Sequence, residues 1–126
     1  MNAFITGAAS GIGRATAEAL INRGWSVALA DLFTDDLEAV RSQAPDRVHI
    51  YKLDVTDADA FEQAVSDFAN KHHGQLRLLF NCAGILEVNR FTDISRERHQ
   101  QILDINIKGV INGCQEAYPY LKAAPE

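Results

Sequence analysis

Short apolar runs alternate with amphipathic helical segments along this chain. The runs cover residues 3–5, 26–30, 48–55 and 76–80, and each has the length of a buried strand. Apolar runs of this kind are typical of parallel sheets that are covered on both faces. Four alternations with right-handed crossovers predict a doubly wound parallel sheet with strand order 3-2-1-4.

Three helices are predicted between these strands, and turn-forming residues mark their ends. Gly24, Pro45 and Gly74 are predicted to end the first, second and third helix. Thr34 and Thr56 are predicted to cap the second and third. The apolar positions at helical spacing are Ile12, Ala15, Thr16, Ala19 and Leu20, then Leu37 and Val40, then Ala58, Phe61, Val65 and Phe68.

A long helical region is predicted from Ser95 onward, after a loop that spans residues 81–92. Pro119 should kink or fray its last turns, because proline lacks a backbone N–H group. The chain is therefore interpreted as α/β, a Rossmann-type doubly wound parallel sheet of four strands followed by this long helix, and as one domain over residues 1–126. The apolar positions of the long helix are Leu103, Ile107, Val110, Ile111, Cys114, Ala117, Tyr118 and Leu121.

Composition and charge restrict the partners of this chain. The formal net charge is −5, whereas a nucleic-acid partner requires a cationic face. No apolar run approaches the ~20 residues that span a bilayer, and no export signal is recognisable at the N-terminus, so we expect a cytoplasmic protein. Cys82 and Cys114 lie in apolar contexts and are expected to be buried free thiols. His72 and His73 are expected to be solvated at a helix end, and no metal site is predicted.

The glycine-rich turn after the first strand is the strongest functional signal. It reads Thr-Gly-Ala-Ala-Ser-Gly-Ile-Gly over residues 6–13 and precedes a helical pattern. Glycine lets the backbone approach a phosphate, and the free N–H groups of the first helical turn point at that phosphate. The turn therefore predicts a dinucleotide pyrophosphate site. Its expected contacts are Gly7, Ser10, Gly11, Ile12 and Gly13.

A carboxylate at the end of the second strand predicts which dinucleotide is bound. Asp31 follows Gly13 by 18 residues, where it can accept hydrogen bonds from the adenosine ribose. It would also repel a 2′-phosphate, and neither Ser10 nor Leu32 is basic. NAD is therefore expected in preference to NADP. The alternative is that Asp31 only caps a turn.

The glycine spacing T-G-x-x-x-G-x-G resembles the short-chain dehydrogenase/reductase family. The segment Asn81-Cys82-Ala83-Gly84 looks like that family's N-N-A-G motif, with cysteine at the second position. The resemblance implies that Asn81, Ala83 and Gly84 lie at the cofactor, with Asn81 mainly tying the loop to the sheet. It also implies that Asp54 contacts the adenine amino group and that Val55 packs on the ring. Asp54 could instead only help to cap the following helix.

Asn106 matches the family's catalytic asparagine, which helps to hold a water in a proton relay. The resemblance implies hydride transfer between NAD and an alcohol or carbonyl substrate by a serine and a Tyr-x-x-x-Lys pair. Tyr118 and Lys122 fit that spacing, but they lie at the end of the long helix with a proline between them, and no serine-bearing strand precedes them. We therefore do not assign them as the catalytic pair. The resemblance implies that the chain is the cofactor-binding half, truncated after the fourth strand and the long helix, which is the fifth in the family's order, and that it is inactive alone.

Two further hypotheses concern alternatives and assembly. A non-catalytic dinucleotide-binding module or subunit would equally explain the missing tyrosine and lysine. A flavodoxin-like domain also alternates strands and helices, but the glycine turn and Asp31 disfavour it. The fourth strand is expected to form an exposed apolar edge, which promotes association. A homo-oligomer is therefore predicted through the Ser95–Lys122 helix, the fourth-strand edge, or both.

Overall fold

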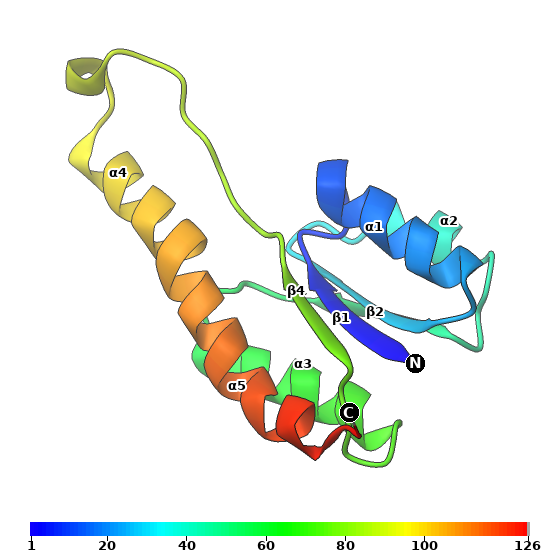
Figure 1. Ribbon diagram of the computed structural model, residues 1–126. Helices are drawn as coiled ribbons and strands as arrows, with labels where there is room; N and C mark the ends of the chain where they lie inside the picture. Colours follow the sequence, from blue (N-terminus) through cyan, green and yellow to red (C-terminus); the bar gives the residue numbers. More distant parts are fainter. Residues whose placement is uncertain (126) are drawn as a thin grey trace.

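The computed structural model describes residues 1–125 and contains one parallel sheet of four strands (Figure 1). Its strands are β1 (Asn2–Thr6), β2 (Ser26–Asp31), β3 (Val48–Lys52) and β4 (Leu78–Asn81). Their order is β3-β2-β1-β4, and all three pairings are parallel. The predicted fold class and strand order are therefore confirmed.

Helices cover both faces of the sheet (Figure 1). They are α1 (Gly11–Asn22), α2 (Leu37–Arg41), α3 (Ala58–Asn70), α4 (Arg96–Leu103) and α5 (Gly109–Ala123). Helices α1 and α2 lie over one face, and α3 and α5 lie over the other. A π-helical segment, Asp104–Lys108, joins α4 to α5 into one continuous helix.

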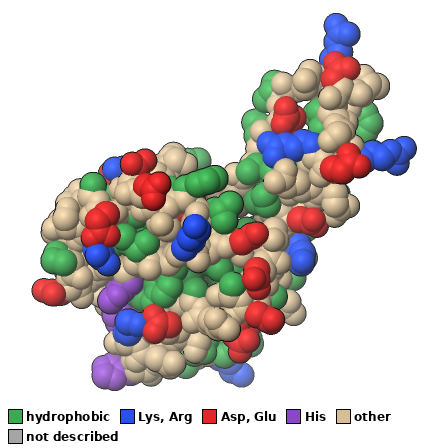
Figure 2. Space-filling view, turned by 180° about the vertical axis from the view of Figure 1, so that it is seen from behind, with side chains coloured by type: hydrophobic (Ala, Val, Ile, Leu, Met, Phe, Trp, Pro, Cys, Tyr) green, Lys and Arg blue, Asp and Glu red, His purple; other side chains and the backbone are tan. Residues whose placement is uncertain are grey.

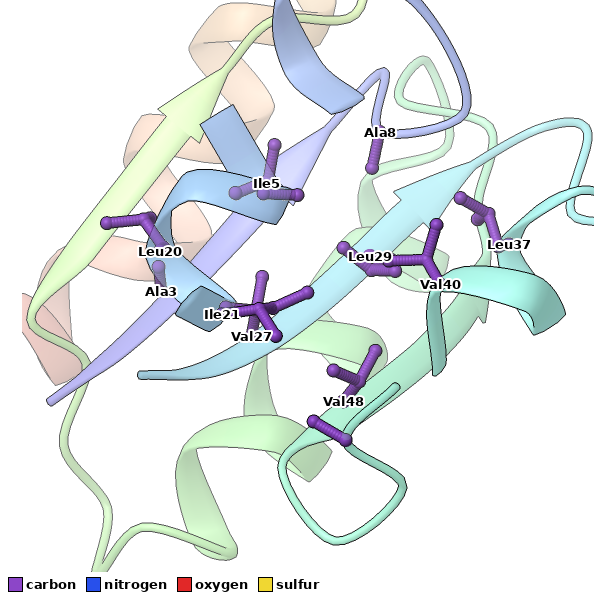
Figure 3. Packing of buried hydrophobic residues seen from close by; sticks show 12 residues of the cluster. Ala3, Ile5, Ala8, Leu20, Ile21, Val27, Leu29, Leu37, Val40 and Val48 are labelled. Carbon is purple, nitrogen blue, oxygen red and sulfur yellow. The ribbon is translucent and has the colours of Figure 1, made fainter. Parts of the chain in front are cut away.

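Alternate residues of the strands supply two separate hydrophobic clusters, as the two-residue period of a strand requires. On the α1 and α2 face, Ile5 and Leu29 pack with helix residues such as Ile21 and Val40 (Figure 3). On the other face, Phe4 is fully buried, with ring centroids 5.9 Å from Phe61 and 6.1 Å from Phe68.

Several predicted element boundaries were wrong by a few residues. Strand β3 ends at Lys52 rather than Val55, and β4 covers Leu78–Asn81 rather than residues 76–80. Helix α2 ends at Arg41, four residues before Pro45, because a turn follows it. The predicted helix stops Gly24 and Gly74 follow the ends of α1 at Asn22 and of α3 at Asn70, and both have positive φ angles, +82° and +73°.

The predicted helix caps were wrong for α2 and α3. Asp57 caps α3, and its Oδ1 accepts the N–H of Ala60 at 3.0 Å. Asp36 occupies the N-cap position of α2 without a side-chain hydrogen bond, and Thr34 contributes only its backbone carbonyl to Leu37. An aspartate one or two residues nearer the helix therefore takes the position expected for each threonine.

The long helix begins where predicted, because the Ser95 hydroxyl accepts the N–H of Arg98 at 3.1 Å. Helix α5 continues through Pro119 to Ala123, so its last turns do not fray at this proline. Most of its predicted apolar face is exposed: the residues of this strip are Leu103, Ile107, Ile111, Cys114 and Tyr118. The face that packs against the sheet and α3 consists of Gly109, Asn112, Gly113 and Ala117.

Helix α1 also buries a different face from the one predicted. Ala15 and Ala19 are exposed, whereas Gly13, Ala17 and Ile21 are buried along with Leu20. Small residues let the helix lie close to the sheet, so its apolar content alone did not identify the buried face. Gly13 shows this most clearly, since a Cβ there would lie within 2.9 Å of the backbone of Gly7.

Candidate functional site

A cleft of about 530 Å³ lies at the carboxyl ends of the strands. In open α/β sheets, ligands bind in the crevice outside these strand ends. Ten of the twelve predicted cofactor contacts line the cleft: Gly7, Ser10, Gly11, Ile12, Asp31, Leu32, Asp54, Val55, Ala83 and Gly84. The sequence interpretation missed six other lining residues, namely Ala30, Phe33, Leu53, Cys82, Ile85 and Ile105.

The glycine turn leads from β1 into the N-terminus of α1. Gly11 has a φ of +54°, and a Cβ there would meet no atom within 4 Å, so its backbone faces open space. The Ser10 side chain makes no capping hydrogen bond. The first N–H groups of α1 therefore have neither side-chain nor helical partners, which is the arrangement that suits an anion.

Gly7 and Thr6 hold this turn against the end of β4. Gly7 has a φ of +66°, and a Cβ on it would lie 2.8 Å from the backbone nitrogen of Ala83. The buried Thr6 hydroxyl accepts the N–H groups of Cys82 and Ala83, both at 3.1 Å. The threonine belongs to the turn motif, but only the tertiary structure shows that it joins the two strand ends.

Asp31 lies at the end of β2 with its carboxylate on the adjoining loops. Its Oδ2 accepts the N–H of Ala9 and its Oδ1 accepts the N–H of Phe33, each at 3.0 Å. Asp31 therefore does cap the adjoining loops, as the alternative interpretation expected. Because each carboxylate oxygen has a second lone pair, this bonding leaves Asp31 able to accept hydrogen bonds from a ligand in the cleft as well.

Asp54 and Val55 form the opposite wall. Asp54 Oδ1 accepts from the N–H of Thr56 at 2.9 Å and from its hydroxyl at 2.7 Å, so Asp54 also orders the start of the next segment. Helix α5 packs directly on Val55, whose carbonyl accepts the buried amide of Asn112 at 2.8 Å. This wall is therefore held rigidly by α5.

Gly13 and Asn81 are the two predicted contacts that do not line the cleft. Gly13 lets α1 approach Gly7, as described above. Asn81 turns toward α5, where its amide donates to the sulfur of Cys114 at 3.6 Å and its carbonyl oxygen lies against Gly113. Their positions in the fold indicate packing roles.

Asn106 lies in the π-helical segment, and its side chain is used by the loop after β4. Its Oδ1 accepts the N–H of Ile85 and its Nδ2 donates to the carbonyl of Ile85, both at 2.8 Å. Residues in π-helical turns frequently occur at functional sites. The side-chain amide thus positions the Gly84–Ile85 wall of the cleft from outside it.

Tyr118 and Lys122 do not line the cleft. Tyr118 is 61% exposed on the outer face of α5. Both cysteines are free, as predicted, but their predicted burial was wrong, because Cys82 is half-buried in the cleft wall and Cys114 is exposed. Within residues 1–125, no cluster of three or more His, Cys, Asp or Glu side chains is arranged to hold a metal ion, and no helix is long and apolar enough to cross a membrane.

The family model described as short chain dehydrogenase matches residues 1–126, and the chain belongs to this family. A relative from Thermotoga maritima, the 3-oxoacyl-(acyl-carrier-protein) reductase FabG, is 34% identical over 121 residues, which cover 94% of this chain and 49% of the relative. A sorbitol dehydrogenase from Cereibacter sphaeroides is 32% identical, covering 86% of this chain and 42% of the relative.

Solved structures show the same relationship. A short-chain dehydrogenase/reductase from Brucella melitensis superposes with a TM-score of 0.88 at 32% identity, covering 94% of this chain and 51% of that one. Carveol dehydrogenase from Mycobacterium avium in complex with NAD gives 0.86 at 25% identity, covering 97% and 50%. The chain spans about a fifth to a half of the length of the curated relatives it matches.

Proposed function

We propose that this chain supplies the NAD-binding half of an oxidoreductase that transfers hydride between NAD and a small alcohol or carbonyl substrate. The cleft carries this proposal, because it combines a glycine turn, a helix N-terminus and an acidic residue at the end of β2. The bound nicotinamide supplies the hydride chemistry. The FabG and sorbitol dehydrogenase relatives support the substrate class by their names alone.

Different residues of the cleft bind different parts of the dinucleotide. The N–H groups after Gly11 hold the pyrophosphate, since they are the donors without partners. Asp31 accepts hydrogen bonds from the hydroxyls of the adenosine ribose. Asp54 accepts a hydrogen bond from the adenine amino group, and Val55 packs on the adenine ring. The backbone of Gly84 lies along the second ribose, and its missing side chain leaves room for Asn106 behind it, a positioning residue that also helps to hold a catalytic water.

Asp31 makes the cleft selective for NAD over NADP in this proposal. A 2′-phosphate would meet the carboxylate and the apolar side chains of Leu32 and Phe33, none of which can neutralise it. Phe33 is 75% exposed at the mouth of the cleft, held there by its N–H bond to Asp31.

Calorimetric titration with NAD and NADP tests the assignment. Asp31→Asn removes the charge and keeps one of the two oxygens that accept loop N–H groups, and we expect it to weaken NAD binding by about tenfold. Leu32→Arg should raise the affinity for NADP relative to NAD. Asp36→Asn is the matched control, because Asp36 is exposed and lies outside the cleft. Unchanged NAD affinity in Asp31→Asn would contradict the proposed role of Asp31.

A non-catalytic dinucleotide-binding module is the alternative, and the position of Tyr118 outside the cleft favours it for the chain alone. We expect the 126-residue chain to bind NAD without turnover. NADH formation from any alcohol of a test panel would exclude the module and would show that the chain is catalytically competent. The role of Asn106 is then tested by Asn106→Ala in that assay.

We also propose that the chain associates with a second copy through the outer strip of its long helix. The strip residues recur every three, four or seven positions, which puts them on one helix face. Asp104 and Lys122 flank the strip and are separated by about five helical turns. In an antiparallel pair with Ile107 opposite Tyr118, Asp104 of each copy lies beside Lys122 of the other, so the charges are complementary.

Charge reversal tests this pairing. Asp104→Lys and Lys122→Asp should each weaken the dimer in sedimentation experiments, and the double variant should restore it. Glu18→Lys on α1 serves as the control for net charge. A sedimenting monomer at low micromolar concentration would exclude self-association, and a dimer unaffected by the reversals would move it to the edge of β4.

A further inference from the structure

Two histidines meet at the contact between β3 and the C-terminal end of α3. The ring of His49, on β3, has its centroid 5.7 Å from that of Phe68, and the ring of His72 lies 4.8 Å from the same phenylalanine. The two imidazole centroids are 6.5 Å apart. Phe68 is fully buried, so both imidazoles pack on the edge of the hydrophobic cluster. The prediction that His72 is solvated was therefore wrong.

The surroundings of this pair are unsuited to positive charge. Buried Nε2 of His72 has no hydrogen-bond partner among the described residues. The neighbouring charged groups are mostly cationic: Lys71 and His73 beside α3, Arg41 of α2, Arg77 before β4 and the amino group of Met1. Asp67 is the acidic neighbour, and it already binds Lys71 and the hydroxyl of Tyr51. Histidine side chains are visible beside basic and acidic ones in the space-filling view (Figure 2).

Along the chain, this contact precedes the residues after β3 that line the cleft. Strand β3 carries His49 and Tyr51 on its α3 face and continues into Leu53 and Asp54, which line the adenine wall. The geometry points to a pH-sensitive contact: neutral His49 and His72 hold β3 against α3, and their protonation loosens this edge of the sheet and, with it, the adenosine side of the cleft. The consequence for the cofactor rests on the proposed function, whereas the consequence for stability does not.

The direction of the effect follows from linkage. Burial, followed by the charge of Lys71, lowers the pKa of His49 from its usual 6.5. Burial, followed by the proximity of His49, lowers the pKa of His72. Below pH 6.5 the unfolded chain therefore binds protons that the folded chain resists. The stabilisation by the neutral pair is complete above pH 6.5 and is lost as the pH falls toward the lowered pKa values.

Thermal unfolding at pH 7.5 and pH 5.5 tests the contact in the full chain. We expect the midpoint to fall by about 4 °C or more on acidification, and to fall by less than half as much in His49→Gln/His72→Gln. His99→Gln is the control, because Nε2 of His99 is also buried without a hydrogen-bond partner among the described residues, but its ring lies against Phe91 and not against β3 or α3. A fall of the same size in the double variant overturns the proposal.

Two further measurements keep the test decisive. Imidazole resonances of the native chain should titrate below pH 6.5 for His49 and His72, and titration at or above 6.5 overturns the proposal even where the variants do not fold. The NAD dissociation constant should rise more between pH 7.5 and 5.5 in the native chain than in the double variant. Absence of NAD binding at pH 7.5 contradicts the proposed function only, since unfolding still reports on the histidine pair.

Discussion

The two faces of the sheet are built from alternate residues of the same strands, yet they differ in chemistry. The buried residues of the face under α1 and α2 are aliphatic, with Ile5, Val27 and Leu29 at its centre, and the aromatic rings of Trp25 and Phe80 lie only at its margin. The face under α3 and α5 is aromatic around Phe4, and its margin carries titratable side chains such as His49. Helix α5 also leaves an apolar strip uncovered on this side.

Because of this difference, within residues 1–125 only the face under α3 and α5 has aromatic side chains at its margin whose charge depends on pH. Aliphatic side chains do not titrate, so the contribution of their packing to the free energy of unfolding does not depend on pH. Aromatic packing at a sheet margin admits histidine and tyrosine, which present an apolar ring and a polar atom together. The α3 and α5 face therefore carries the histidine pair, the exposed strip of α5 and the Leu53–Val55 wall of the cleft.

The largest expected effect comes from Phe61→Ala. Phe61 is fully buried on the aromatic face and touches both Phe4 and the Gly113 region of α5. Loss of its ring should cost about 3–5 kcal/mol in the free energy of unfolding, measured by urea denaturation. Leu29→Ala on the aliphatic face should cost about 2–5 kcal/mol. Val88→Ala, 86% exposed, should change it by less than about 0.5 kcal/mol.

Phe61 lies on the face that α5 covers and Leu29 on the opposite face. The contrast between the two faces is therefore wrong if Phe61→Ala leaves the position of α5 unchanged while Leu29→Ala changes it. Near-UV circular dichroism in the phenylalanine and tyrosine bands reports on the α3 and α5 face, where most of these rings lie, whereas the tryptophan band reports on Trp25 at the face under α1 and α2.

A smaller effect is expected from Gly113→Ala, which tests how closely α5 lies on β4. A Cβ at this position would overlap the carbonyl oxygen of Asn81 and lie 2.9 Å from Phe61 Cζ. Overpacking of this kind should cost about 1–3 kcal/mol, measured by the same urea titration. Gln115→Ala, on the exposed side of α5, is the control. A neutral or stabilising Gly113→Ala would mean that the helix can move away without penalty.

The smallest effect concerns the tyrosine at the sheet margin. Burial, aided by the hydrogen bond to Asp67, raises the pKa of Tyr51 above its usual 10. The folded chain therefore keeps a proton that the unfolded chain loses, so stability should fall as the pH rises above 10. Tyr51→Phe should cost about 0.5–1.5 kcal/mol at pH 8 and should weaken this alkaline fall. Tyr118→Phe is the exposed control, and an equal fall in Tyr51→Phe would contradict the assignment.

Much of the fold and of the cleft was predictable from the residues. The glycine turn, Asp31 and the Ala83–Gly84 segment each follow a strand, and parallel strands bring their carboxyl ends to one edge of the sheet. Phe33, Leu53, Cys82 and Ile85 were missed, although each is adjacent in sequence to a predicted contact. Local pattern identifies where a strand ends but does not show which neighbouring side chain turns inward.

The buried faces of α2 and α3 agree with the predicted apolar positions, whereas those of α1 and α5 were less predictable. The strip of the long helix has the apolar periodicity of a core-facing surface, yet the buried face consists of Gly109, Asn112, Gly113 and Ala117. Glycine and alanine occur where a helix backbone lies close to its neighbour. Because their side chains are small and only weakly hydrophobic, they add little to the hydrophobic periodicity from which a buried face is predicted. The caps of α2 and α3 failed for a similar reason, because several cap-forming residues stand side by side there and the backbone selects among them.

The sequence by itself determined the order of strands and helices, the glycine turn and the acidic residue at the end of β2, since these depend on periodicity and local backbone preference. Only the tertiary structure decided that Thr6 joins β1 to β4, that Asn106 holds Ile85, and that His49 and His72 meet on Phe68. The physical reason is separation along the chain: these contacts join residues 21 to 77 positions apart or from different elements, and packing in three dimensions alone sets which of them meet.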